Sequence, residues 1–91
     1  MSRFINRHEA VTWLEEDRAE RGITLTADSQ TQWDQWIEHE LPSSDPMDAC
    51  EVMTDRHLEI AKMKGKNTKK FWHPRITRTD GGVFEVGAYV L

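Results

Sequence analysis

Apolar residues recur at helical spacing in two segments of the first half of the chain. We expect a first helix over about residues 7–21, with Asn6 as its N-cap and Gly22 just beyond its last turn. A second helix is expected over about residues 27–41, capped by Thr26. In this segment four apolar residues keep the i, i+3, i+4, i+8 spacing of a buried stripe: Trp33, Trp36, Ile37 and Leu41. Each helix is therefore predicted to bury one side.

The segment over about residues 46–64 is predicted to be a third helix. Pro46 would occupy its first position, where proline loses no useful hydrogen bond, and Gly65 would end it. At 3.6 residues per turn its apolar side chains spread over more than half of the circumference. We therefore expect this helix to be central and contacted from two sides.

The last part of the chain has the pattern of a β-hairpin. Two strands are expected over about residues 69–79 and 83–91, joined at Asp80-Gly81-Gly82. The sequence therefore predicts an α+β fold, a three-helix N-terminal part followed by a C-terminal β-hairpin, in a single compact domain spanning residues 1–91.

The turn also predicts the register of the hairpin. With Gly81-Gly82 as a two-residue turn, Arg78 lies opposite Glu85. This register puts Phe84 on one face of the hairpin and Trp72 on the other. Pro74 has no N–H to donate to a ladder, so we expect its strand to be an edge or to bulge there.

Length and composition exclude several classes of protein. No apolar run approaches the ~18 residues of a membrane span, and the N-terminal residues lack the pattern of a secretory signal. Cys50 is the single cysteine, which excludes an internal disulfide framework. We therefore expect no membrane association and a reduced, cytoplasmic setting.

The net charge of −4 conceals an uneven distribution along the chain. Residues 1–61 carry 14 acids against five bases, a difference of −9. Residues 62–91 carry seven bases against two acids, a difference of +5. Such asymmetry affects association with partners rather than the fold.

The residue types of catalytic and metal sites do not form a convincing pattern. Cys50 and His57 would share a face of the predicted third helix, as a nucleophile and its base must. That face is apolar, and burial raises the pKa of a thiol and makes it inert. The four histidines are scattered, without i, i+4 spacing. We expect neither an enzyme nor a bound metal or cofactor.

Four acids of the predicted third helix would line one side of it, at i, i+3, i+7 and i+11: Asp48, Glu51, Asp55 and Glu59. Like charges at such spacings destabilise a helix by about 0.2–0.5 kcal/mol each. A solvated face is the simpler interpretation, and a docking surface for a basic protein, including one that normally holds nucleic acid, is the other. We expect a small non-enzymatic binding protein, an inhibitor or adaptor, with these four acids as its partner-binding residues.

The basic C-terminal segment supports an alternative function. It combines cations that suit phosphates with an aromatic ring that suits bases: Lys66, Lys69, Lys70, Trp72, Arg75 and Arg78. The alternative is therefore a nucleic-acid-binding regulator. A competing interpretation places Trp72 in the core, with the lysines keeping an edge strand soluble. A third option is a homodimer, in which this segment pairs with the acids of another copy.

Overall fold

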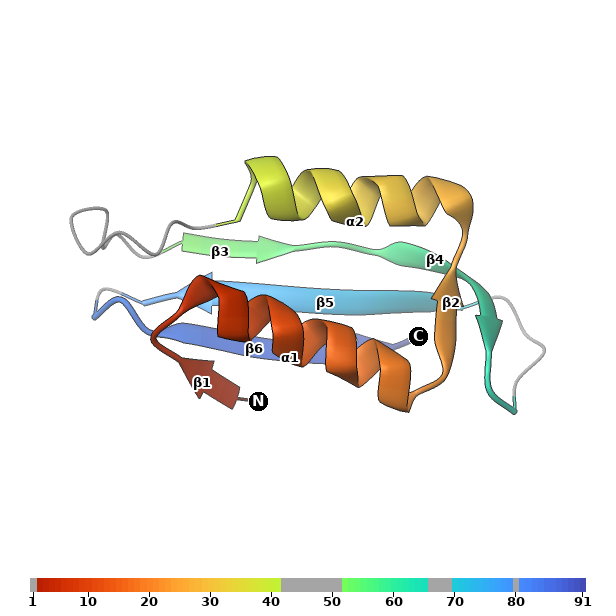
Figure 1. Ribbon diagram of the computed structural model, residues 1–91, viewed down its shortest axis with the longest axis horizontal. Coiled ribbons are helices and arrows are strands. Elements are labelled where there is room, and N and C mark those ends of the chain that lie inside the picture. The colour runs from red at the N-terminus through yellow and green to blue at the C-terminus, as the bar shows by residue number, and fades with distance from the viewer. Residues whose placement is uncertain (1, 42–51, 66–69, 80) are drawn as a thin grey trace.

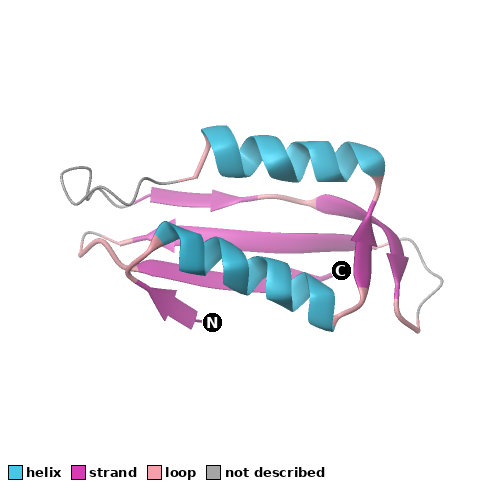
Figure 2. Ribbon diagram, in the orientation of Figure 1, coloured by secondary structure: helices cyan, strands magenta, loops and turns pink. Residues whose placement is uncertain are grey.

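The computed structural model describes residues 2–41, 52–65, 70–79 and 81–91 of the chain. Within these residues the chain forms two helices, α1 (Arg7–Glu20) and α2 (Ala27–His39). The described strands are β1 (Ser2–Phe4), β2 (Ile23–Leu25), β3 (Val52–Asp55), β4 (Leu58–Met63), β5 (Phe71–Arg78) and β6 (Phe84–Val90). The α+β class is confirmed (Figure 2). Three helices followed by a hairpin is wrong, because most of the predicted third helix is strand.

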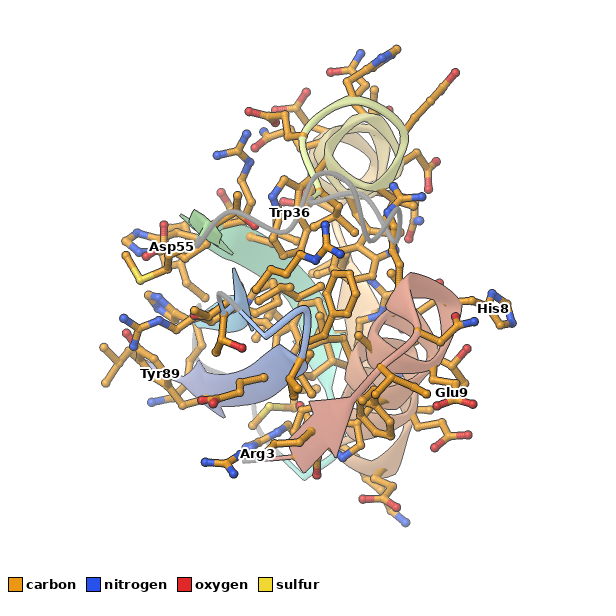
Figure 3. All side chains as sticks on the ribbon, turned by 90° about the vertical axis from the view of Figure 1, so that its left-hand side faces the viewer. Arg3, His8, Glu9, Trp36, Asp55 and Tyr89 are labelled. Atoms are coloured by element: carbon orange, nitrogen blue, oxygen red, sulfur yellow. The ribbon has the colours of Figure 1, made fainter. Side chains whose placement is uncertain are left out.

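The strands form one antiparallel sheet in the order β1-β6-β5-β4-β2, and β3 pairs with β5 on the side away from β6. Both helices lie on one side of this sheet, α1 against β6 and β5 and α2 against β4 (Figures 1 and 3). No described helix covers the other face of the sheet, from which Asp55 and Tyr89 project (Figure 3). The fold therefore has two layers and one open sheet face.

The core lies between the helices and the sheet and is built around three tryptophans. The ring of Trp33 lies 5.3 Å from the ring of Trp36 and 5.3 Å from that of Trp72. All three side chains are buried, as are Leu14 of α1 and Phe84 of β6. The apolar stripe predicted for the second helix is confirmed at its two tryptophans, which join that helix to the central strand.

Both helices begin at the predicted caps. The Asn6 side chain accepts hydrogen bonds from two backbone N–H groups of the first turn of α1, at 2.7 and 3.3 Å. The Thr26 hydroxyl accepts one from the backbone N–H of Ser29 at 3.1 Å. Gly22 follows α1 with a φ of 68°, the left-handed conformation that glycine adopts most easily. Neither described helix is long and apolar enough to cross a membrane.

The predicted third helix is wrong over residues 52–63, where residues 52–55 form β3 and residues 58–63 form β4. Residues 46–51 lie outside the described residues. The side chains of Leu58 and Ile60 in β4 are buried against the helices. The side chain of Asp55, at the end of β3, is exposed. This alternation has the period of a strand. Both strands pair with β5, and this long-range pairing outweighs the helical spacing of the apolar residues.

The predicted hairpin forms, with a register shifted by one residue. Arg78 pairs with Phe84 and Thr77 with Glu85, instead of Arg78 with Glu85. The backbone N–H of Thr79 donates to the carbonyl of Val83 at 3.0 Å. Three residues therefore lie between the hydrogen-bonded ends of the two strands, instead of the predicted two. Because a shift of one residue exchanges the faces of a strand, the apolar side chains of β5 and β6 lie together on the helix side.

Pro74 lies in the centre of the sheet and not at its edge, because β6 pairs with β5 on one side and β3 and β4 on the other. Its carbonyl accepts from the backbone N–H of Arg56 at 3.2 Å, but its ring nitrogen has no hydrogen to return. Asp55 pairs with Arg75 and Leu58 with Trp72, so the register continues without a bulge. The proline therefore interrupts the neighbouring ladder and divides it into β3 and β4.

Candidate interaction surfaces

The acids predicted to bind a partner do not form a strip on a helix. Asp48 and Glu51 lie outside the described residues. Asp55 ends β3 and Glu59 lies in β4, at alternate positions that face away from the helices. Asp55 is exposed and Glu59 is half-buried. The two described members therefore belong to the open side of the sheet.

The residues of the alternative nucleic-acid site are divided between the two faces. Lys66 and Lys69 lie outside the described residues. Trp72 is buried, and its indole N–H donates to Asp17 at 3.0 Å. Arg78 is also buried, with its guanidinium 5.4 Å from the Phe84 ring centre. Neither Trp72 nor Arg78 is exposed for contact with a base or a phosphate. Among the described members, Lys70 is half-buried and Arg75 is exposed.

The pair of residues considered for catalysis is also placed differently from the prediction. His57 lies between β3 and β4 on the open side of the sheet, and not on a helix. Cys50 lies outside the described residues. Over the described part of the chain, no group of three or more His, Cys, Asp or Glu side chains is arranged to hold a metal ion.

The outer sides of α1 and α2 carry a dense set of acids, which we call the acidic helix layer. It consists of seven exposed side chains: Glu9, Glu15, Glu16, Glu20, Asp28, Asp34 and Glu38. In Figure 3 the labelled Glu9 projects from α1 on the side away from the sheet. The two arginines within the helices, Arg7 and Arg18, are half-buried. The outer surface of the helices is therefore strongly negative.

Contacts within the protein account for the inward position of both arginines. The Arg7 guanidinium donates to the backbone carbonyl of Ile37 at the end of α2. The Arg18 guanidinium lies 5.2 Å from the centres of the Trp33 and Trp72 rings, a cation–π arrangement with both. Burial lowers the pKa of Arg18, and the nearby Glu15 and Asp34 oppose that shift. Both cations thus serve the packing of the helices rather than the neutralisation of the outer surface.

The placement of the acids does not favour helix stability. Glu9 and Asp28 lie in first turns, where negative charge is favourable to the helix dipole. The other exposed acids lie further along, and they include two like-charge pairs at i, i+4: Glu16 with Glu20, and Asp34 with Glu38. Each such pair destabilises a helix by about 0.2–0.5 kcal/mol. Glu15 does contribute to packing, because it accepts a hydrogen bond from the indole N–H of Trp33 at 3.4 Å. Helix stability therefore does not explain the two like-charge pairs.

The uncovered side of the sheet forms a second surface, the open sheet face. It is formed by alternate residues from β3 to the end of the chain: Met53, Asp55, His57, Glu59, Phe71, His73, Arg75, Thr77, Glu85, Gly87, Tyr89 and Leu91. Four large apolar side chains on it are 41–68% exposed. Its charged groups are the carboxylates of Asp55, Glu59 and Glu85 and the guanidiniums of Arg75 and, on the adjoining β1, Arg3, which pairs with Glu85 at 3.5 Å. This face is therefore mixed in character and not basic.

A row of three rings crosses the middle of the open sheet face. The His73 ring lies 4.3 Å from that of His57 and is stacked on that of Tyr89 at 4.5 Å and 7°. Burial lowers the pKa of His73, His57 lowers it further, and Asp55 opposes the shift. A cavity of about 40 Å³ beside these rings has room for water but not for an organic ligand. The three rings therefore pack against one another over the central strand β5.

A groove of about 460 Å³ runs between α1 and the outer edge of β6. Its lining combines two aromatic rings, two guanidiniums and one carboxylate with the backbone of β6: Trp13, Asp17, Arg21, Arg75, Gly87, Ala88 and Tyr89. Asp17 and Arg21 form an ion pair at 2.9 Å. Within the described part of the chain, Arg75 forms no ion pair, and its guanidinium contacts the sulfur of Met53. The volume is in the range of ligand-binding pockets.

Comparison with known proteins adds no further assignment: neither a protein-family model, nor a curated protein, nor a solved structure matches this chain significantly. The functional inference therefore rests on the geometry of the chain itself.

The open sheet face and the groove were missed from the sequence, although one signal for the first is present. Polar and apolar residues alternate over residues 57–60, a short stretch with the pattern of a half-buried strand. The same residues also fit a helical spacing, which was preferred because Pro46 resembles a helix start. The groove has no local signal, because α1, β5 and β6 are distant in the sequence.

Proposed function

We propose that this chain is a small non-enzymatic binding protein, an inhibitor or adaptor, which docks its acidic helix layer on a basic surface of a protein partner. The observation that supports this function is the separation of charge within the helices. Seven acids are exposed on their outer sides, while Arg7 and Arg18 are held inward by contacts with α2 and the tryptophans. An acidic surface of this kind attracts a basic partner and orients it before contact.

The proposal moves the expected binding residues from one element to another. Asp55 projects from the opposite side of the sheet (Figure 3). Glu59 lies on that same side through its register with Phe71, so neither acid shares a surface with the acidic helix layer. We assign the docking role to the two like-charge pairs instead, Glu16 with Glu20 on α1 and Asp34 with Glu38 on α2. Their mutual repulsion would be relieved by a cation placed between them.

The experiment compares three forms of the tagged protein in affinity capture from a cell lysate, with the bound proteins identified by mass spectrometry. The first is the wild type, and the second carries Glu16→Lys, Glu20→Lys, Asp34→Lys and Glu38→Lys. The third is a control with Asp55→Lys, which changes an exposed acid on the opposite face. We expect one or more basic proteins to be captured by the wild type and the control and lost from the fourfold variant. Equal recovery with the fourfold variant would contradict the proposal.

Nucleic-acid binding by the C-terminal hairpin is a second proposal, supported by one observation on the open sheet face. Phe71 and Tyr89 are exposed aromatic rings, and Arg75 lies on the same face. Rings and cations together are used to bind single strands. Asp55 and Glu59 on this face work against a phosphate backbone. A polarisation titration with single-stranded DNA and RNA at about 50 mM salt tests it, and the absence of binding there excludes it.

A further inference from the structure

Two histidines lie opposite each other on the open sheet face. The register of β5 with β3 and β4 places His57 directly across from His73. Their ring centres are 4.3 Å apart, and the ring planes are tilted by 54°, so the two rings are not stacked. Tyr89, on the β6 side, is stacked on His73 at 4.5 Å and 7° and holds that ring from the other direction. The sheet itself therefore brings two imidazoles together.

The ring nitrogens of this pair are not used by contacts within the described residues. The side chain of His73 is only 9% exposed, and its Nδ1 is buried without a hydrogen-bond partner there. No ion pair among the described residues involves His57 or His73. Buried polar atoms in folded proteins nearly always bond to protein, water or an ion. The pair therefore has lone pairs that the fold does not occupy.

The cavity of about 40 Å³ on the open sheet face lies beside both rings. Pro74 also lines it and opens the ladder there, because it has no N–H to return to the neighbouring strand. That strand is interrupted between Asp55 and Leu58, and His57 lies in the interruption. The volume admits water or a single ion and excludes an organic ligand. The size and the lining of the cavity therefore point to a small cation.

The charged groups around the cavity are compatible with a cation. Two guanidiniums line it, but both have partners of their own: Arg56 forms an ion pair with Glu40, and Arg75 contacts the sulfur of Met53. The carboxylate of Asp55 also lines the cavity and, among the described residues, forms no ion pair. Asp55 therefore supplies negative charge beside the two imidazoles.

The separation of the rings indicates the class of cation. A metal–nitrogen bond of about 2.0–2.1 Å places the centre of a bound imidazole about 3.2 Å from the metal. Two such centres would lie about 5.2 Å apart at tetrahedral zinc and about 4.5 Å apart at adjacent positions of tetragonal Cu²⁺. The observed 4.3 Å fits the second arrangement. Cu²⁺ also has the highest affinity of the first-row divalent ions for nitrogen ligands.

We propose that His57 and His73 bind one divalent transition-metal ion, best fitted by Cu²⁺, through one nitrogen of each ring. Over the described residues no third His, Cys, Asp or Glu is arranged to complete such a site, so water fills the remaining positions. The ion joins β5 to the interrupted segment across Pro74, on the side of the sheet from which Asp55 and Tyr89 project (Figure 3). This site is separate from the acidic helix layer and does not depend on its function.

The test uses metal-free protein without a polyhistidine tag, titrated with Cu²⁺ by calorimetry at neutral pH. All forms carry Cys50→Ser, because a thiol is itself a copper ligand. We expect one ion per chain, and His57→Gln and His73→Gln should each weaken binding by at least about tenfold, since each removes one of two protein ligands. His8→Gln, at an exposed histidine on α1, is the matched control and should leave the affinity unchanged.

Two spectroscopic measurements locate the ion. Electron paramagnetic resonance of the equimolar complex should show coupling to two imidazole nitrogens, reduced to one in His57→Gln. In NMR spectra, the amide signals around residues 57 and 73 should broaden first, while those around His8 stay sharp. His57 is exposed, so if His73→Gln fails to fold, His57→Gln decides.

Three outcomes would overturn the proposal: no binding up to about 1 mM Cu²⁺, equal affinities of the wild type and His57→Gln, or broadening centred away from residues 57 and 73. None of them affects the capture experiment with the acidic helix layer.

Discussion

The indole N–H of Trp72 donates to the carboxylate of Asp17 across 3.0 Å, joining the central strand β5 to helix α1. The same carboxylate oxygen accepts from the Nε of Arg21 at 2.9 Å. Asp17 thus connects a buried aromatic ring, the helix end and the groove at the β6 edge. An acid that appears from the sequence to be one more surface charge is part of the packing between the two layers.

Replacement of Asp17 by Ala should therefore lower the stability of the fold. The change leaves the buried indole N–H of Trp72 without its partner and removes the ion pair with Arg21. We expect a loss of about 1.5–3 kcal/mol in the free energy of unfolding, measured by urea denaturation. Glu16→Ala, at the neighbouring exposed acid, should change it by less than about 0.5 kcal/mol. Equal effects of the two variants would show that the Trp72 contact contributes nothing.

Alanine substitutions along β4 should distinguish a strand from the helix that the sequence predicts. Leu58→Ala and Ile60→Ala remove buried side chains and should each cost about 2–5 kcal/mol of stability. Ala61 is exposed in the strand, whereas the helical interpretation counts it among the apolar contacts. Ala61→Ser should therefore leave the urea midpoint nearly unchanged. A large loss of stability at Ala61 would contradict the strand.

Gly22 should be intolerant of any side chain. Its φ is 68°, and an added Cβ would lie 2.5 Å from the Cβ of Lys64, at the base of that side chain. Gly22→Ala should destabilise the fold by about 1–3 kcal/mol through backbone strain, and by more through this contact. Gly87→Ala is the matched control, because its Cβ would meet no atom within 4 Å. Thermal melting of both variants should show a lower Tm only for Gly22→Ala.

The stability should fall in mildly acidic solution because of His73. Burial lowers the pKa of His73 from its ordinary value of 6.5, so the unfolded chain takes up a proton at higher pH than the folded chain does. The contribution of His73 is thus fully present above about pH 6.5 and is lost as the pH falls through the lowered pKa of the folded state. Urea midpoints measured from about pH 7.5 to about pH 5.5 should decrease.

Two variants test whether His73 causes this pH dependence of stability. His73→Gln should flatten the curve, and His8→Gln, at an exposed position on α1, should leave its slope unchanged. If the wild type and His73→Gln respond to acid in the same way, His73 is not the group responsible.

Several features could be predicted from the sequence because they depend on neighbouring residues. Asn6 and Thr26 cap their helices through side chains only a few residues away from the groups they bond. Trp33 and Trp36 are both buried by one face of α2. The hairpin follows from two apolar strands around a glycine-rich turn, although its register differs from the predicted one by a residue. Local chemistry is sufficient for such elements.

The candidate surfaces could be predicted less well from neighbouring residues in the sequence. Asp55 and Glu59 were expected on a helix, because apolar residues at positions such as 58 and 61 also fit a helical period. Only β5, which pairs with both segments, decides that they are strands. The acidic helix layer could be anticipated in part, since its acids lie outside the apolar stripes. The inward position of Arg18 could not, because it depends on Trp72, far away in the chain.

The sequence by itself determined two amphipathic helices, a hairpin near the C-terminus, and the separation of an acidic first part from a basic second part. Only the tertiary structure decided which surfaces result. Strand pairing satisfies backbone groups between distant segments, so it sets the β3–β5–β6 sheet and its uncovered face. Long-range hydrogen bonds of this kind carry no local signature, since a strand with one buried face and a helix with one buried stripe can share the same few apolar residues.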